Sequence, residues 1–479
     1  MIKPLGTEAG RRVSLLLMAA SAVTSAWADT KFEPSVTVGT VYVDNFDLVP
    51  PGVPKTGEWI GELIPRLQMQ EQAPNLTGVL DYSAEGLLFS NRSDLDAVHN
   101  IGAGNVAWTA MPNLLFVEAR ASYTQQTIDP TQPNNTGNLF GVGNVANEFD
   151  AVVAPYLKRD FGTMTGLLRY EESISDFSGT GGNTDAGLLE NSRTDIITAD
   201  LAADSKDAPF FWRIDGSSAR TTFNTAEPFR ADRILLEGSE AVLPSLRLTE
   251  TAGAETNILT HSTSGGLNAG FWSAGFKWAP STRTLVEGSA GHRFFGPAYM
   301  LNWTHQSRLL KYHVTYSEVA TDAGESVALT DFVPGQLQVD PRAYSGVLRS
   351  IDTYDPYVAK QLDAGLDLVL HRTQLSLHVY DLRRRYLTLG LLDNSDSTRG
   401  AEIVLNRQLG PFDNLKLSAN VDTANEVTGF VFHDYRYAVE YTRNLAQKID
   451  LSLVLVRFQR DGSAPYRTDI GELMLRKSF

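Results

Sequence analysis

Most of the chain after residue 30 alternates between apolar and polar positions with a period of two. In the stretch 76–88, every second residue is apolar, glycine or tyrosine, and the opposite face carries Asp81, Ser83 and Glu85. The same alternation recurs in three further stretches: 115–124, 362–370 and 415–422. This pattern predicts β-strands with one face against an apolar medium and the other against water. Helices are not expected there, because apolar residues do not recur at every third and fourth position.

The predicted strands run to about 10 to 13 residues. Strands of soluble domains cluster near ~5–6 residues, whereas a tilted membrane strand needs ~9–11. A soluble β-sandwich also alternates, but strand length and aromatic residues near strand ends favour a membrane barrel. The expected interfacial aromatic residues are Trp59, Trp108, Trp212, Trp278, Trp303, Tyr435 and Tyr466. The predicted strands are 33–43, 59–70, 76–89, 102–110, 114–126, 148–159, 161–172, 193–204, 209–220, 230–237, 243–250, 268–278, 282–293, 297–307, 309–320, 358–370, 373–386, 399–408, 413–422, 434–444, 448–459 and 468–479.

Connection lengths give these strands a direction. If the last strand ends in the periplasm at Phe479, the short connections 111–113, 279–281 and 409–412 lie on the periplasmic side. The opposite side receives the long connections 127–147, 173–192, 251–267 and 321–357. The alternation is least regular in 102–110, 230–237 and 243–250, so we expect 18 to 22 strands. The predicted fold is therefore all-β: a transmembrane, antiparallel, up-and-down β-barrel with long extracellular loops and short periplasmic turns.

Residues 1–28 have the features of a secretory signal peptide. Basic residues precede an apolar stretch, 13–20, and Ala26-Trp27-Ala28 gives a small-residue cleavage site. The alternative, a retained anchor, is disfavoured because the apolar stretch is far shorter than the ~20 residues of a membrane-spanning helix. We expect residues 29–479 to form one barrel, with too few residues before the first strand for an N-terminal plug or a periplasmic repeat domain.

Charge and cysteine content exclude several functions. The chain contains 41 Lys and Arg, 56 Asp and Glu and no cysteine, and its formal charge is −15. Because residues 1–28 carry three basic residues and one acidic residue, the exported chain has a charge of −17. Nucleic-acid binding is not expected, since phosphate neutralisation requires clustered Lys and Arg. Disulfides, thiolate metal sites and a lipoprotein anchor require cysteine, and no cofactor is expected.

The polar faces of the strands carry both charge signs. The predicted lumen residues are Asp81, Glu85, Glu118, Arg120, Arg169, Glu171, Asp363, Asp367, Glu402, Lys416, Asp422, Arg436 and Glu440. Facing acids and bases could form a transverse field that orients solutes, or they could form cross-strand ion pairs that satisfy a polar interior. Arg383, Arg384 and Arg385 form the strongest basic run, at the outer end of strand 373–386. Guanidinium groups there could bind lipopolysaccharide phosphates, or line a pore mouth for acidic sugars; alternation would divide the three between the lumen and the lipid side.

Two other segments have candidate chemistry. His292-Arg293-Phe294-Phe295-Gly296-Pro297 could contact a sugar or lipid headgroup, but a tight hairpin with Gly and Pro as turn residues and the two Phe residues at the interface is the favoured explanation. His305 and Ser307 share a strand face and could belong to a lipase-like site. Asn302 falls on the opposite face, so a local triad is not formed and enzymatic activity is not expected.

Several stretches are similar to a known family. The segment 270–299, from Gly270 to Tyr299, together with 41–48, 115–126 and 466–479, resembles outer-membrane β-barrels associated with PEP-CTERM/exosortase systems. The resemblance covers most of the exported chain. It implies a genomic association with exopolysaccharide biosynthesis and protein sorting in Gram-negative bacteria, and it supplies no catalytic residues because the family is functionally uncharacterised.

These observations favour a non-enzymatic barrel of the outer membrane. The leading hypothesis is a channel or secretion-supporting component for exopolysaccharide or a sorted surface protein. A non-conducting anchor for polysaccharide and an outer-leaflet lipid-modifying enzyme are the alternatives. Expected partners are outer-membrane lipid, lipopolysaccharide, exopolysaccharide export components and the barrel assembly machinery, which would read Phe479; Lys477 makes that terminal signal less apolar.

Overall fold

The protein is a closed 22-stranded antiparallel β-barrel. The computed structural model describes residues 30–129, 131–133, 135–179, 189–203, 208–258, 263–321, 356–386, 395–426 and 429–479. The strands are β1 (Lys31–Val43), β2 (Glu58–Ala73), β3 (Leu76–Phe89), β4 (Ala97–Met111), β5 (Leu115–Thr127), β6 (Val145–Asp160), β7 (Met164–Gly179), β8 (Ser192–Ala203), β9 (Phe210–Phe223), β10 (Phe229–Leu243), β11 (Leu246–Glu255), β12 (Ala269–Ser281), β13 (Thr284–Arg293), β14 (Gly296–Gln306), β15 (Leu310–Thr321), β16 (Tyr357–Val369), β17 (Thr373–Tyr386), β18 (Ser395–Gln408), β19 (Asp413–Asn425), β20 (Val431–Ala446), β21 (Ile449–Gly462) and β22 (Tyr466–Ser478). Two 3₁₀ turns, η2 (Ser93–Leu95) and η3 (Thr136–Asn138), lie in the connections. No helix in the described part of the chain is long and apolar enough to cross a membrane.

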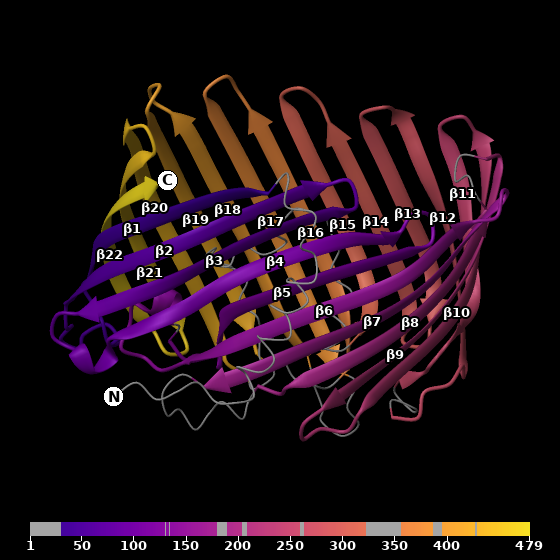
Figure 1. Cartoon of the computed structure of the whole chain (residues 1–479). Coiled ribbons are helices and arrows are strands. Elements are labelled where there is room, and N and C mark those ends of the chain that lie inside the picture. The colour runs from indigo at the N-terminus through magenta and orange to yellow at the C-terminus, as the bar shows by residue number, and fades with distance from the viewer. Residues whose placement is uncertain are drawn as a thin grey trace.

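Pairing of the first and last strands closes the wall. Each strand pairs with its neighbours in sequence, and β1 also pairs with β22, from Ser35 opposite Ser478 to Val43 opposite Ile470. Figure 1 shows the strands side by side around one continuous wall. We call the end with the β2–β3 and β20–β21 turns the periplasmic end, and the opposite end the outer end. Closure leaves no strand edge unpaired, which a sheet surrounded by hydrocarbon requires.

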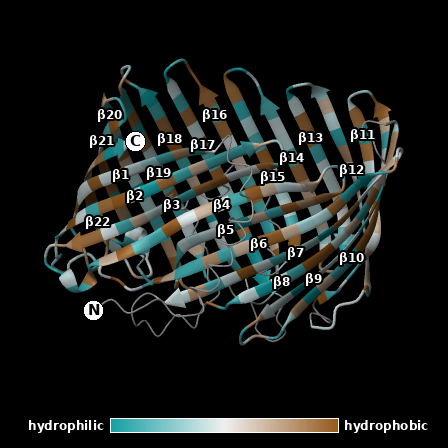
Figure 2. Cartoon of the chain, in the orientation of Figure 1, coloured by the Kyte–Doolittle hydropathy of each residue, from teal (hydrophilic) through white to brown (hydrophobic). Residues whose placement is uncertain are grey.

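The two faces of the wall differ as the alternation predicts. On β21, Leu453 and Leu455 point outward and are about half exposed, whereas Val456 and Phe458 point inward and are buried. Brown and teal positions alternate along the strands in Figure 2. The outward face therefore offers an apolar band to lipid, and the inward face holds buried charged residues such as Asp81 and Glu171.

All 22 predicted strands correspond to strands of the barrel, including the three with the least regular alternation. The largest shift is in β7, which begins three residues later and ends seven residues later than the predicted 161–172. Residues 279–281, predicted as a turn, belong to the end of β12. The extra length of β7 is made of polar residues such as Ser173 and Ser175, which are buried inside the barrel, where polar side chains are acceptable.

Most of the predicted interfacial aromatic residues lie on the outward surface. Trp59, Trp108, Trp278 and Trp303 are exposed there, and Trp59 packs against Tyr42 with 4.9 Å between ring centroids. Tyr466 is the exception and corrects the prediction, since it points inward and is 6% exposed. The signal segment 1–28 and nearly all of the predicted 321–357 loop lie outside the described residues.

Barrel closure can be tested with engineered cysteines, because the native chain has none. Thr37 of β1 lies opposite Arg476 of β22, whereas Asp450 lies one strand further away on β21. A disulfide requires Cα atoms less than ~7 Å apart, so Thr37→Cys with Arg476→Cys should cross-link under mild oxidation. Thr37→Cys with Asp450→Cys should remain reduced in the same assay, a mobility shift on non-reducing gels. Equal cross-linking of both pairs, or of neither, would contradict the β1–β22 seam.

Candidate functional site

The outer mouth of the barrel is narrowed by connections that fold inward. Residues 44–57, between β1 and β2, place Phe46 and Leu48 in an apolar cluster on the inner wall. The connection 128–144, between β5 and β6, adds Leu139 and Phe140 to the same cluster. The wall residues of this cluster are Val41, Val43, Ile60, Leu87, Phe89, Val456, Phe458, Tyr466 and Ile470. These apolar inward residues bind the two connections to one side of the lumen, because burial removes their surface from water.

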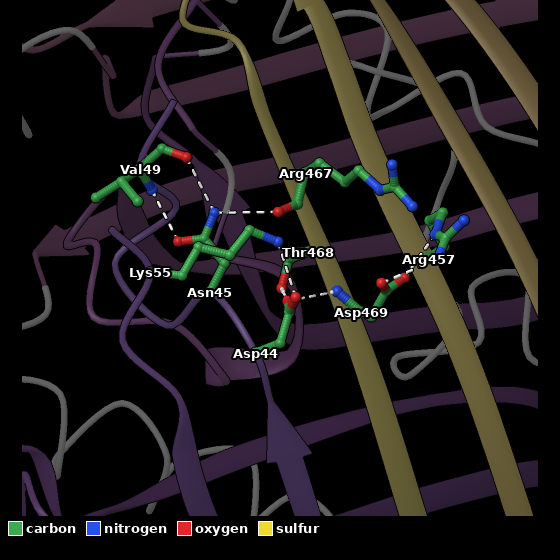
Figure 3. Close-up of polar contacts among 8 residues, drawn as sticks. All are labelled: Asp44, Asn45, Val49, Lys55, Arg457, Arg467, Thr468 and Asp469. Atoms are coloured by element: carbon green, nitrogen blue, oxygen red, sulfur yellow. Dashed lines mark hydrogen bonds and ion pairs between the residues drawn. The ribbon is translucent and has the colours of Figure 1, made fainter. Parts of the chain in front are cut away.

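The first connection is also fixed at the seam between β1 and β22, as Figure 3 shows. Asn45 is fully buried and donates from Nδ2 to the carbonyl of Val49 at 3.0 Å and to that of Arg467 at 3.1 Å. Asp44 accepts from the backbone N–H of Asp469 at 2.7 Å and from Thr468 Oγ1 at 3.1 Å. These bonds satisfy backbone groups where the regular ladder ends, so the seam and the inward connection stabilise each other.

The second connection also reaches β21, along the same side of the lumen. The Arg460 side chain is fully buried and donates to the carbonyl of Gln132 at 2.8 Å. Its other nitrogens donate to both carboxylate oxygens of Asp434 at 2.7 Å, and its guanidinium lies over the ring of Phe432 at 4.2 Å. Gly141 N–H donates to the carbonyl of Phe46 at 3.0 Å, which joins the two connections directly. We call the contact between Arg460 and Gln132 the latch.

A buried carboxyl group lies near the latch. Glu426 follows the last residue of β19 in an outer connection, is 6% exposed, and its Oε1 has no hydrogen-bond partner among the described residues. Burial is the main cause that raises the pKa of Glu426 to about 7; Asp396 and Asp129 raise it further, while Arg384 and Arg460 oppose the rise. Since Asp129 lies in the connection that the latch holds, ionisation of Glu426 should repel that connection.

The lumen residues predicted on β5 and β7 form one ion-pair group. Arg169 Nη1 lies 2.7 Å from Glu118 Oε2, and its Nη2 lies 2.9 Å from Glu171 Oε2. Arg120 interacts electrostatically with the same three residues and with Asp150. Phe116 and Tyr156 stack beside them at 5.0 Å. The arrangement is the cross-strand pairing expected for a polar interior rather than two separate walls of opposite charge.

Near the seam, several glutamates gather on the inner wall. Glu62 interacts electrostatically with Glu85 and Glu472, although it lies on a different strand from each. Glu472 in turn interacts with Arg436, which attracts it, and with Glu440, which repels it. The sequence predicted Glu85, Arg436 and Glu440 as lumen residues but did not show that they meet. Four carboxyl groups and Arg436 therefore interact in this part of the lumen, and Lys416 lies opposite Glu440.

On the inner face of β15–β17, Asp363 lies between two histidines. Its two oxygens are 2.8 Å from His313 Nε2 and 2.5 Å from His378 Nε2. Asp367 accepts a hydrogen bond from Ser376 at 2.5 Å. No group of three His, Asp or Glu side chains in the described part of the chain is placed to hold a metal ion.

The basic run on β17 divides between the two faces. Arg384 points inward, is 5% exposed, and forms a bidentate pair with Asp396 at 3.1 and 3.0 Å. Arg383 and Arg385 are exposed on the outward face, and Arg383 pairs with Asp381 at 2.7 Å. The three residues therefore belong to two different environments.

The candidate segment 292–297 makes contacts that stabilise the fold. Phe294 and Phe295 form the turn between β13 and β14 and pack beside Phe229, so their predicted place at the lipid interface is wrong. Gly296 begins β14 with a φ of 117°, a value that favours glycine. Phe294 and Phe295 are partly buried because they pack against a cluster that includes Ile258 of a neighbouring connection. The sequence pattern does not predict the course of that connection.

His305 and Ser307 do not bond each other in the structure. His305 Nδ1 lies 2.8 Å from Thr284 Oγ1, and the ring stacks on Tyr312. Ser307 donates to the carbonyl of Leu310 at 2.9 Å inside a periplasmic turn. Asn302, on the other face, donates to Glu287.

The alternation of apolar and polar residues did not predict that two connections fold inward. It also did not identify Arg460 or Glu426 as part of the site. One available signal was the pair of large apolar residues, Phe46 and Leu48, in an otherwise polar connection. The pairing of Arg460 with Gln132 joins segments 328 positions apart, and no local pattern specifies such a contact.

No family model matches the chain, and no curated protein matches it. Its fold is similar to that of the FrpB iron transporter from Neisseria meningitidis (TM-score 0.50, 9% identity, covering 94% of this chain and 83% of that one). Other similar solved structures include the siderophore receptor PirA from Pseudomonas aeruginosa (0.48, 10%, 94% and 80%). OccK2 (OpdF), also from Pseudomonas aeruginosa, has a TM-score of 0.36 and 9% identity, with coverage of 94% and 98%. At 9% identity, the likeness to FrpB shows a shared barrel fold alone.

The latch should weaken as pH rises. Because the pKa of Glu426 is raised from its ordinary value of 4.5 to about 7, the latched arrangement binds this proton more tightly than a released one. Latching is therefore strongest below about pH 4.5, weakens progressively up to about pH 7, and then levels off. With Leu139→Cys as the reporter, thiol labelling relative to Val53→Cys should rise at least about tenfold between pH 5 and pH 8. Glu426→Gln should abolish the increase, and an increase that persists in this variant would contradict the assignment.

Proposed function

We propose that this protein resides in the outer membrane of a Gram-negative bacterium and provides a passage whose outer mouth is controlled by its inward connections. The observation that carries the proposal is the latch, which holds an inward connection against the inner face of a closed 22-stranded wall. Barrels of ~16–18 strands already enclose an aqueous channel, and 22-stranded transporters enclose a lumen that must be filled or plugged. A lumen of this size with charged walls is suited to passage of polar material.

We further propose that the material is exopolysaccharide, or a surface protein sorted by an exosortase system. The resemblance of 270–299 to barrels of PEP-CTERM/exosortase systems supports the context. The inner wall also carries side chains of the kinds that bind sugars. These are the stacked aromatic rings of Phe116 and Tyr156, and the imidazole of His378 with the carboxylate of Asp363. Aromatic rings present apolar faces to sugar rings, and paired polar groups exchange hydrogen bonds with hydroxyls.

Two other functions make different predictions. A non-conducting anchor would hold polysaccharide on its outer connections and leave the lumen closed under all conditions. A lipid-modifying enzyme would need a nucleophile and base in contact, and His305 and Ser307 each bond other groups instead. Substituting both with Ala should leave the lipid composition of the membrane unchanged.

Conductance in planar bilayers separates a passage from an anchor. Arg460→Gln removes a fully buried guanidinium and leaves Asp434 without its bidentate partner. Losing one partner of a buried pair costs about 3–5 kcal/mol locally, so this variant should spend more time in a high-conductance state than the wild type. Arg457→Gln is the matched control, because Arg457 lies on the same strand but points outward to Asp469.

A deletion of residues 322–355, which lie outside the described residues, provides a second arm of the experiment. If the wild type, the Arg460 variant and the deletion all remain electrically silent, the passage is refuted in favour of an anchor. Loss of exported polysaccharide in a strain lacking the gene, with conductance retained by the purified protein, would support exopolysaccharide as the material. Unchanged polysaccharide export would leave the passage intact and contradict the choice of substrate.

A further inference from the structure

The outward surface of β16, β17 and β18 carries a group of basic residues at the outer end of the barrel. Lys360 lies opposite Arg383, and Arg385 is the next outward residue along β17. Arg399 of β18 lies opposite Asp381, one outward position below Arg383. Adjacent strands are ~4.8 Å apart and outward residues on one strand ~6.6 Å apart, so the backbone positions of the four cations lie within one patch roughly 14 Å across. We call these four residues the basic patch.

The patch has an excess of positive charge. Arg383 pairs with Asp381, and Lys360 pairs with Glu318 at 3.1 Å. Among the described residues, Arg385 and Arg399 form no ion pair, so two carboxylates face four cations. This excess is unusual in a chain whose total charge is −15.

Other parts of the same rim are neutral. On β7 and β8, Arg193 is shared between Glu172 at 3.1 Å and Asp195 at 3.4 Å. Near the seam, Arg457 pairs with Asp469 at 2.6 Å, and Lys55 pairs with Asp44 at 2.8 Å. Each of these cations has its own carboxylate, as expected when ion pairs simply satisfy a polar rim.

The residues directly below and beside the patch suit a lipid. Toward the middle of the wall, the outward face continues with exposed apolar side chains at Leu377, Val379 and Ile403. Beside Arg383 and Arg385, β18 presents Ser397 and Ser395. Asn425 donates to Ser397 Oγ at 3.0 Å on the same side. The cations and the serine hydroxyls thus share the level of the rim, and the apolar strip lies below them.

We propose that the basic patch binds the phosphate groups of a phosphorylated lipid in the outer leaflet, with the acyl chains along Leu377, Val379 and Ile403. A phosphate monoester carries about −1.5 to −2 charges and three acceptor oxygens. Guanidinium groups match such oxygens with paired, charge-assisted hydrogen bonds. Binding of this kind is independent of what passes through the lumen, because the patch is on the opposite face of the wall. Arg384, which points inward, takes no part.

Native mass spectrometry of the full-length protein, released from detergent, tests the site with three probes. These are lipid A carrying both phosphates, the same lipid after removal of the phosphates, and inorganic phosphate. The test variant combines Arg383→Gln, Arg385→Gln and Arg399→Gln, and the matched control combines Arg193→Gln, Arg220→Gln and Arg230→Gln on another part of the rim. Loss of charge-assisted bonds should weaken binding of phosphorylated lipid A at least about tenfold in the test variant, and less than about twofold in the control.

Each other outcome has a defined meaning. Undiminished binding by the test variant, equal loss in both variants, or equal binding of the dephosphorylated lipid would overturn the proposal. Displacement of the lipid by an equimolar concentration of inorganic phosphate would also overturn it, since the acyl chains would then contribute nothing. Replacing the same three arginines with Lys should retain binding within a few-fold, which guards against a folding defect in the Gln variant, as does an unchanged heat-induced mobility shift on gels.

Discussion

The structure depends on one constraint: a backbone surrounded by hydrocarbon must satisfy all of its hydrogen bonds within the wall. The pairing of β1 with β22 meets that constraint, because it removes the two edges that an open sheet of this size would expose. The constraint also fixes which residues face which medium. Once the ladder is closed, each strand must present alternate residues to lipid and to the lumen, and a shift by one residue would move every charged inward residue into the membrane. The seam is accordingly reinforced at its outer end, where Asp44 and Asn45 bond the backbone of β22.

Closure with this many strands creates a second requirement, since a wide lumen is not filled by the side chains of the wall alone. The chain meets it at the outer mouth by turning two connections inward. Apolar burial holds Phe46 and Phe140 against the wall, and the guanidinium of Arg460 satisfies a backbone carbonyl of the second connection. The outward rim faces the lipid leaflet instead. There the basic residues of β16–β18 outnumber the carboxylates that pair with them. The two faces of one strand therefore have different roles. On β17, Arg384 points inward and pairs with Asp396, whereas Arg383 and Arg385 point outward.

The sequence predicted the wall well because alternation is a local property. It placed all 22 strands and the inward position of residues such as Glu118 and Asp363, which need only the parity of each strand. It did not bring Glu62 and Glu472 together, because β2 and β22 lie on either side of β1 only once the seam is closed. Tyr466 was assigned to the lipid interface from its residue type, although parity places it inside. The latch was beyond prediction for a further reason: it depends on the path of a connection with no periodic pattern. The resemblance to exosortase-associated barrels implies a genomic association. The identity of the substrate is a hypothesis based on that association.

An experimental structure in lipid nanodiscs at pH 5 would test the central claim, the inward course of the connection 128–144. The account predicts density for this segment inside the wall, with the carbonyl of Gln132 within hydrogen-bond distance of Arg460, which lies 2.8 Å from it here. It also predicts Phe46 and Phe140 packed against β1–β3 and β21–β22. Density that leaves the lumen open and carries residues 128–144 outward above the rim would contradict the claim.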